Sequence, residues 1–303
     1  MKVRAIIAML SAVFAATGAM AEEEQANFHH VHINAMDPAK SVEFYRKFWG
    51  GVAVKYAGKT DVVLTDRSFI FFNKVATPAA SELRSAIYHI GWGGVDGPSE
   101  YEWRKKEGMQ FETPGTPLIG QYYMYIFGPD REVIEIWTAF HHNRFGHVHL
   151  FADDVNVTAR WYRQHLGLDG VDKDVPKPKA APADYVVKPS DASIFQYLWM
   201  NAVKVDDVEL NIFGKPDKEY GIWWNYEPIE TLEPTKGRVV DHLAFSYKDI
   251  KPVFERMKAA GVEIVEPITF KEEYQFNSFF VMGPDKVTIE IVEAKPLPEG
   301  IWE

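Results

Sequence analysis

A long-range duplication constrains the fold of this chain more than any other feature. The stretch His30-Val31-His32 returns as His147-Val148-His149, 117 positions later, and each copy continues into an aspartate, a Tyr-Arg pair and a glycine. Apolar and polar residues alternate through each opening stretch, which predicts a strand with one apolar face. Asp37-Pro38 then predicts a helix start. Solenoid repeats are about 20 to 50 residues long, so this longer period indicates a duplicated domain.

A fainter repeat relates the segment beginning at His89 to the segment beginning at His242, 153 positions later. Both segments run from a histidine-bearing strand through an amphipathic helix and finish with short strands. The chain therefore contains four modules, and each is too small to bury a helix on a sheet alone. We expect the first two modules to pair as a domain over residues 24–143, and the last two over residues 144–303.

The N-terminus has the pattern of a secretory signal peptide. Lys2 and Arg4 precede an apolar run, and Ala19-Met20-Ala21 supplies a small-residue cleavage site. The run is too short for a convincing membrane span. We expect residues 1–21 to be removed and the protein to be secreted or periplasmic.

Composition limits the partners and the chemistry. Removing Lys2 and Arg4 with the signal peptide changes the formal net charge from −10 to −12. An acidic surface argues against nucleic acid or an anionic membrane as a partner. The chain has no cysteine, so any metal must be held by histidine and carboxylate.

Two segments interrupt the regular pattern. Residues 172–184 are rich in Pro, Lys and Ala, which predicts a loop. Residues 221–234 carry Trp223 and Trp224 in a turn-rich stretch. This second segment is interpreted either as a lid over a pocket or as a packed connection.

The candidate metal ligands recur at equivalent places in the modules. His30 and His89 lie in opening strands, and Glu135 lies between two isoleucines of a closing strand, where a buried carboxylate needs a partner. Two imidazoles and one carboxylate suit non-haem Fe(II), and also Mn, Ni or Zn. The second half repeats this set as His147, His242 and Glu290, with Glu209 as an additional candidate.

The remaining histidines receive other interpretations. His32 and His149 share a face with the candidate ligands but lie about 7 Å further along their strands, which favours contacts behind the ligands or to substrate. His29, His141 and His142 are expected outside strands, at the surface or in a linker.

These motifs resemble those of the vicinal oxygen chelate superfamily, which includes glyoxalase I, extradiol dioxygenases, methylmalonyl-CoA epimerase and the fosfomycin and bleomycin resistance proteins. The opening pattern is present in HVHINAMD and HVHLFADD, and the closing GPD…IE pattern ends both halves. The resemblance implies an α+β fold with four βαβββ modules paired into two cupped, barrel-like domains. It also implies a divalent metal inside each cup.

The resemblance implies different ligand sets in the two halves. Glyoxalase I and the epimerase use four ligands, which the second half matches with His147, Glu209, His242 and Glu290, and either glutamate is a candidate proton shuttle. The first half has Phe71 or Ser68 in place of Glu209, depending on register. Its three ligands are similar to those of extradiol enzymes, and Tyr125 occupies the place of their tyrosine, where the second half has Phe280. Neither half carries the full dioxygenase signature.

Three functions follow as expectations. The leading one is an exported metal enzyme of isomerase or lyase type, which binds a small oxygenated molecule by bidentate chelation. The first alternative is an Fe(II) ring-cleaving dioxygenase that uses His30, His89 and Glu135 with Tyr125. The second is a binding protein without catalysis, as in bleomycin resistance. Copies of the chain could also pair as a homodimer.

Overall fold

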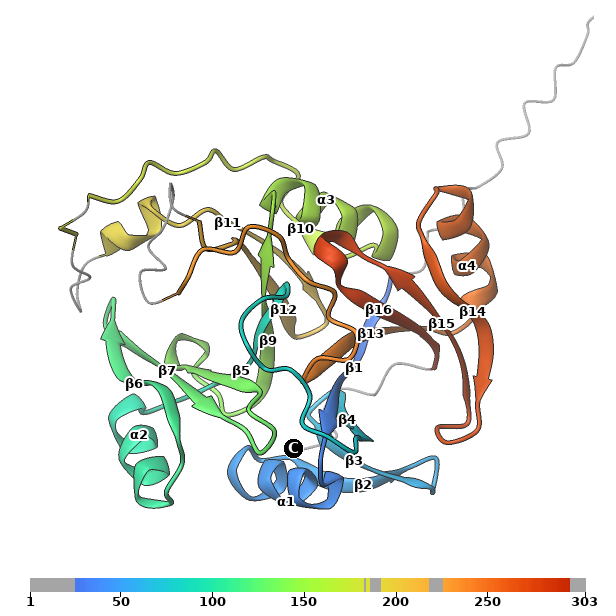
Figure 1. Cartoon of the computed structure of the whole chain (residues 1–303), viewed down its shortest axis with the longest axis horizontal. Coiled ribbons are helices and arrows are strands. Elements are labelled where there is room, and N and C mark those ends of the chain that lie inside the picture. The colour runs from blue at the N-terminus through green and yellow to red at the C-terminus, as the bar shows by residue number, and fades with distance from the viewer. Residues whose placement is uncertain (1–24, 183, 186–191, 218–225, 295–303) are drawn as a thin grey trace, which may run out of the picture.

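The computed structural model describes residues 25–182, 184–185, 192–217 and 226–294 (Figure 1). The predicted signal peptide, Trp223 and Trp224 lie outside these residues.

The described strands form two mixed eight-stranded sheets, here called sheet A and sheet B. In spatial order, sheet A contains β14 (Ile264–Lys271), β15 (Phe276–Met282), β16 (Thr288–Glu293), β13 (Val240–Tyr247), β1 (Asn27–Ala35), β4 (Ser68–Lys74), β3 (Thr60–Thr65) and β2 (Val52–Tyr56). Sheet B contains β10 (Asp169–Gly170), β11 (Met200–Val205), β12 (Val208–Gly214), β9 (Phe145–Ala152), β5 (Ile87–Gly93), β8 (Val133–Trp137), β7 (Gln121–Phe127) and β6 (Phe111–Leu118). Each order ends in two edge strands, so the sheets are open and not closed barrels. The α+β class and the paired modules are confirmed.

The predicted pairing of modules is corrected by the strand order. Sheet A joins the first module to the fourth through the antiparallel ladder of β1 with β13. Sheet B joins the second module to the third through β5 with β9. The first module therefore does not share a sheet with the second, nor the third with the fourth. The repeat gives all four opening strands a similar pattern, and this pattern does not specify which of them become neighbours.

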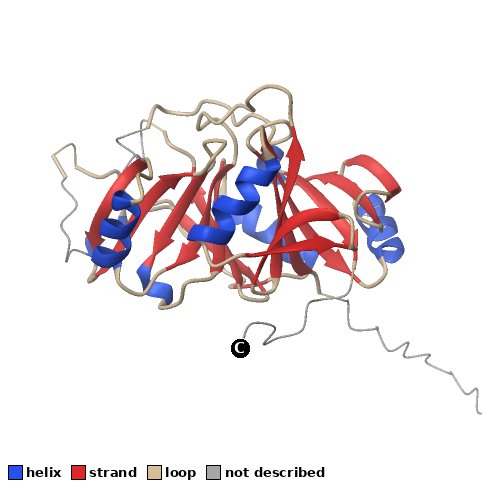
Figure 2. Ribbon diagram, turned by 90° about the horizontal axis from the view of Figure 1, so that it is seen from below, coloured by secondary structure: helices blue, strands red, loops and turns tan. Residues whose placement is uncertain are grey.

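In the described part of the chain, four α-helices complete the modules: α1 (Pro38–Phe48), α2 (Gly97–Lys106), α3 (Val155–Leu166) and α4 (Ile250–Ala259). Helices α1 and α3 lie between the two sheets, while α2 and α4 cover the far ends (Figures 1 and 2). Tyr45 of α1 stacks on Trp92 of sheet B, and Tyr162 of α3 meets Phe245 of sheet A. One apolar core thus fills the space between the sheets, and the opposite faces of the sheets are left for the sites.

The aspartates after the opening strands cap the helices. Asp37, Asp96, Asp154 and Asp249 each accept a hydrogen bond from a backbone N–H in the first turn of α1, α2, α3 and α4. The repeat of aspartate therefore reflects one local rule, applied four times: each new helix needs an acceptor for its unpaired N–H groups.

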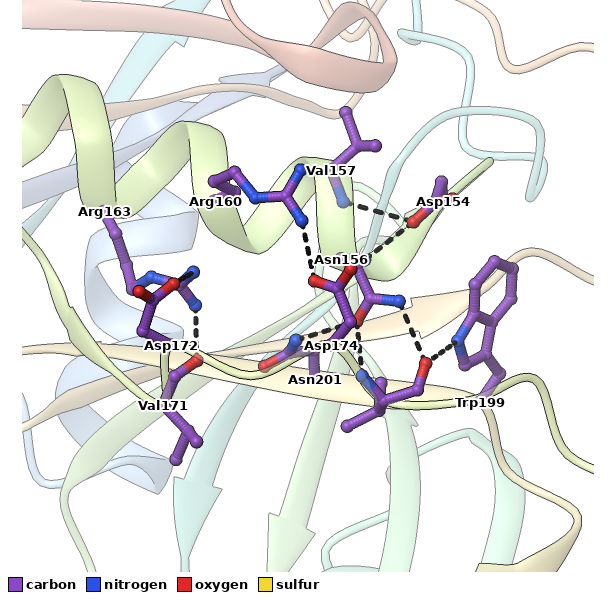
Figure 3. Close-up of polar contacts among 11 residues, drawn as sticks. Asp154, Asn156, Val157, Arg160, Arg163, Val171, Asp172, Asp174, Trp199 and Asn201 are labelled. Carbon is purple, nitrogen blue, oxygen red and sulfur yellow. Dashed lines mark hydrogen bonds and ion pairs between the residues drawn. The ribbon is translucent and has the colours of Figure 1, made fainter.

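The predicted loop begins as a segment fastened to α3 (Figure 3). Asn156 donates to the Val175 carbonyl and accepts from the Val175 N–H, while Arg160 and Arg163 pair with Asp174 and Asp172. The described part of the second irregular segment packs into the core through buried Ile229 and Leu232. No helix among the described residues is long and apolar enough to cross a membrane.

Candidate metal centres

Among the residues that the structure describes, His and Glu side chains converge in two buried groups, one in each sheet. Centre A contains His30, His32, His242 and Glu290, and centre B contains His89, Glu135, His147 and His149. Within each group the ligand atoms lie within 4.8 Å of one another. Each centre draws residues from both halves of the sequence.

The structure corrects the predicted groupings. His30 does not join His89 and Glu135; it lies with His242 and Glu290 in sheet A. His147 instead takes the place beside His89 and Glu135 in sheet B. The dioxygenase set and the four-ligand set predicted from sequence are therefore both divided between the sheets. Glu209 lies in neither group, and the predicted sets followed a pairing of modules that the strand order does not show.

In centre A, two imidazoles point at one carboxylate. The Nε2 atoms of His30 and His242 each lie 3.3 Å from Oε2 of Glu290. Apart from these contacts with Glu290, neither Nε2 has a hydrogen-bond partner among the described residues. Burial raises the pKa of Glu290, but hydrogen bonds and charge from His242 and His30 outweigh this effect and hold that pKa well below its usual range.

Hydrogen bonds behind the two imidazoles orient them. Nδ1 of His242 lies 2.6 Å from Oδ1 of Asp241, whose Oδ2 accepts from the Gly237 N–H at 2.7 Å. Because a carboxylate accepts, Nδ1 of His242 carries the proton, and its Nε2 in the neutral ring has a free lone pair. A carboxylate behind a histidine is the usual arrangement around a metal ligand.

His29 is a contact that sequence reasoning missed. It was expected outside a strand, but it lies buried in β1, with Nδ1 2.7 Å from Nδ1 of His30 and Nε2 3.1 Å from the Tyr56 hydroxyl. Burial, then the neighbouring His30, lowers the pKa of His29 well below its usual value, so this imidazole is neutral. The departure from strict alternation comes from a β-bulge between Phe28 and His30, which the sequence pattern does not reveal.

In centre B, one carboxylate oxygen binds two imidazoles. Oε2 of Glu135 lies 3.0 Å from Nε2 of His89 and 2.7 Å from Nε2 of His147. The Nδ1 atoms of His89, His147 and His149 have no partner among the described residues. Gly91 makes room for this arrangement, since a Cβ there would lie 1.9 Å from Nε2 of His147.

Two further predicted residues line centre B. Tyr125 pairs with Glu135 in the ladder of β7 with β8, and its ring lies 4.9 Å from that of His89. Burial, then Glu135, raises the pKa of Tyr125 well above its usual value. Glu209 is the parallel ladder partner of His147 and is half-buried. Since aligned residues of neighbouring strands share a face, Glu209 projects to the same side as His147 but remains outside the converging group.

Centre A has a phenylalanine where centre B has Glu209. Phe69 is the parallel ladder partner of His30, just as Glu209 is the partner of His147. The counterpart expected from sequence was Phe71 or Ser68, and the observed register replaces both with Phe69. Phe280 pairs with Glu290 as Tyr125 pairs with Glu135, so this predicted equivalence agrees with the ladders.

The two centres differ in enclosure. In centre A every member is at most 4% exposed, and a separate apolar cluster that includes Phe69, Phe71 and Phe276 fills the same face of sheet A. In centre B the His149 side chain is 14% exposed, and Glu209 and Tyr125 are half-buried. Centre B is therefore the one whose walls reach solvent.

Both centres fit a divalent cation. Each gathers three imidazoles and one carboxylate, and neutral imidazole with carboxylate is a donor set that first-row metals accept. Burial lowers the pKa values of His30, His32, His89 and His149, which favours the neutral, ligating form. Both centres also contain buried ring nitrogens without a hydrogen-bond partner among the described residues. A bound ion or ligand would give these nitrogens the partner that buried polar groups normally have.

Comparisons with known proteins agree with this architecture. Residues 144–291 match the family model described as the Glyoxalase/Bleomycin resistance protein/Dioxygenase superfamily. The structure resembles glyoxalase I from Zea mays with a TM-score of 0.63 and 13% identity, over 88% of this chain and 92% of that chain. It also resembles a Bacillus subtilis protein provisionally designated a dioxygenase, with a TM-score of 0.59 and 12% identity, over 91% and 87%. No curated protein matches the chain.

Proposed function

Because the chain belongs to the glyoxalase, bleomycin resistance protein and dioxygenase superfamily, we propose that it is a divalent-metal enzyme with its catalytic site at centre B. The proposed reaction is of isomerase or lyase type on a small molecule with two adjacent oxygen atoms. These oxygens would occupy the metal positions that the protein leaves open.

One observation carries this proposal: centre B has a second carboxylate, Glu209, next to the converging ligands but not among them. His89, His147 and Glu135 converge within hydrogen-bonding distance. Glu209 lies beside His147 on the same face, outside that group. An isomerase needs both a charge-stabilising centre and a separate group that moves a proton. Centre A has no counterpart, since Phe69 occupies the equivalent position.

We assign a separate role in this reaction to each residue of centre B. His89, His147 and Glu135 would hold the cation, which when bound polarises a substrate carbonyl and stabilises negative charge on its oxygen. Glu209 would take a proton from the carbon next to that carbonyl and return it to a neighbouring atom. Tyr125 remains protonated because its pKa is raised, so its hydroxyl is available to donate a hydrogen bond to the substrate.

The test compares proton exchange in two variants of centre B. Purified protein loaded with Zn(II), Ni(II) or Mn(II) is incubated in D2O with a panel of small α-hydroxycarbonyl compounds, and loss of the α-proton signal is followed by NMR. Glu209→Gln should keep the metal and lose exchange by about 100-fold or more, the usual contribution of a general base. His89→Ala should lose the centre B metal as well. Exchange unaffected by Glu209→Gln would refute the role of Glu209.

A second candidate function is favoured by Tyr125. Its position beside His89 and opposite Glu135 gives centre B two imidazoles, one carboxylate and a tyrosine, a set that also suits Fe(II) and dioxygen. Reconstitution with Fe(II) and a catechol series under air separates the two candidates. Oxygen uptake that depends on His89 would favour ring cleavage, whereas proton exchange without oxygen uptake would favour the isomerase.

Export is proposed on the sequence pattern of residues 1–21. A mature N-terminus near Glu22, measured by mass spectrometry on protein recovered from outside the cytoplasm, is the expected result. An intact Met1 in that fraction would contradict cleavage.

A further inference from the structure

We propose that centre A is a structural metal site with four protein ligands, in which His32 is the fourth ligand beside His30, His242 and Glu290. In this arrangement the ion fastens the first module of the chain to the last. The inference is independent of the reaction at centre B. It changes the interpretation of His32, which its spacing along β1 had suggested to be a more distant contact.

His32 is a buried side chain without a partner. It is 3% exposed, and neither of its ring nitrogens has a hydrogen-bond partner among the described residues. Leaving a buried polar group unpaired destabilises the folded state. His32 is the antiparallel ladder partner of His242, and their ring centroids are 4.6 Å apart. A ligand atom of His32 therefore lies within 4.8 Å of those of His30, His242 and Glu290.

The surroundings of centre A leave little room for a substrate. Phe71 stacks on His30 with ring centroids 4.2 Å apart, and Phe69 covers the position that Glu209 holds in centre B. Tyr274 and Phe276 stack on each other and belong to the apolar cluster that fills this face. Structural metal sites are closed by four protein ligands, whereas catalytic sites keep an open position. Centre A has the features of the closed kind.

The outer contacts also distinguish centre A from centre B. Asp241 holds Nδ1 of His242, and His29 holds Nδ1 of His30, so the Nε2 atoms are directed inward. Nδ1 of His89 and Nδ1 of His147 have no such contact among the described residues. Outer contacts fix the orientation of ligands and raise affinity for a metal. The ligand side chains of centre A are therefore already oriented, which favours a higher affinity for a metal ion than at centre B.

The ion would connect strands from the two ends of the chain. His30 and His32 come from β1, His242 from β13 and Glu290 from β16. The two strands of this ladder, β1 and β13, are thus more than 200 positions apart in the sequence. Three imidazoles and one carboxylate suit Zn(II), Fe(II), Ni(II) or Cu(II) better than Mg(II) or Ca(II).

Cobalt(II) serves as the probe in a variant that binds only at centre A. In a His89→Ala background, one Co(II) should bind per chain and give the intense visible absorption of four-coordinate cobalt. Adding His32→Ala should weaken Co(II) binding at least about tenfold, the low end of the effect of losing even an outer contact, and should change the spectrum. The matched control is His149→Ala in a His242→Ala background, which reports on the equivalent position in centre B.

Stability measurements distinguish loss of a ligand from loss of the fold. Removing the metal by chelation should lower the Tm of the His89→Ala protein, because an ion bound only to the folded state stabilises it. His32→Leu should leave the Tm of the metal-free protein unchanged or higher, since it removes an unpaired buried polar group. Unchanged Co(II) affinity in His32→Ala would exclude His32 as a ligand. A Tm unaffected by chelation would exclude the structural role, and neither outcome bears on proton exchange at centre B.

Discussion

Gly91 is the single residue on which the geometry of centre B most depends. His147 lies opposite Gly91 in the ladder of β5 with β9, and its ring occupies the space that a side chain at position 91 would need. The equivalent position in centre A is Ala244, opposite His30, whose ring is turned onto Phe71 instead. Position 91 has no side chain and position 244 has a methyl group, and the imidazoles opposite these two positions are oriented differently.

Gly91→Ala should therefore disable centre B selectively. The new Cβ would meet ring atoms of His147 at 1.9–2.3 Å, so the imidazole must move away from Glu135. We expect metal affinity at centre B to fall at least about tenfold, measured by titration in a His242→Ala background. Adding His147→Ala should relieve the clash and restore the Tm without restoring metal binding. Full metal affinity in Gly91→Ala would contradict this account.

Glu132 gives a prediction for the dependence of stability on pH. It is fully buried, and burial raises its pKa to about 7 from the ordinary 4.5, although the Tyr45 hydroxyl donates to it at 2.7 Å. The folded protein therefore binds a proton that the unfolded chain has released between these values. As pH rises through this window, Glu132 lowers the free energy of unfolding by at most about 3 kcal/mol.

Tyr45→Phe should destabilise the protein more at pH 8 than at pH 5. The Tyr45 hydroxyl donates to ionised Glu132 at pH 8 and to protonated Glu132 at pH 5. A hydrogen bond to a carboxylate is stronger than one to a neutral carboxylic acid by about 1 kcal/mol. Urea unfolding at both values measures the difference. Tyr162→Phe, the matched change in α3, removes a hydroxyl without a partner and should show no such dependence. Equal effects of Tyr45→Phe at both pH values would contradict the role of Glu132.

At the scale of the elements, local signals predicted most of each module. The aspartates before α1 and α3 cap their helices, and Gly167 ends α3 in the left-handed region with φ of 71°. Alternation placed His147 and His149 on one face of β9. The sequence pattern failed at the bulge in β1, which brought His29 into contact with His30. A bulge depends on the neighbouring strand, so its position is not contained in the pattern of one strand.

At the scale of the whole molecule, each metal centre requires both halves of the chain. Centre A needs His30 from the first half with His242 and Glu290 from the second, while centre B needs His147 from the second half with His89 and Glu135 from the first. The units that share a sheet are therefore the first with the fourth and the second with the third.

Separated halves should test this arrangement directly. A fragment of residues 144–303 contains His147, Glu209, His242 and Glu290, but these belong to different sheets. We expect neither this fragment nor residues 24–143 to bind Co(II) with the affinity of the whole chain, and we expect co-expression to restore binding. Binding of one Co(II) by the isolated fragment with undiminished affinity would instead support pairing of the third module with the fourth.

The sequence alone determined the four modules, their helix caps and glycines, and the residue types of both centres, because short-range periodicity and backbone chemistry specify these features. The tertiary structure alone decided which modules share a sheet, and with that which histidines meet which glutamate. It also placed Phe69 opposite His30 and Glu209 opposite His147, so that an aromatic ring covers one centre and a half-buried carboxylate lies beside the other. The physical reason is that similar strands compete for the same neighbours, and only packing of the complete chain, with α1 and α3 between the sheets (Figure 1), selects among them.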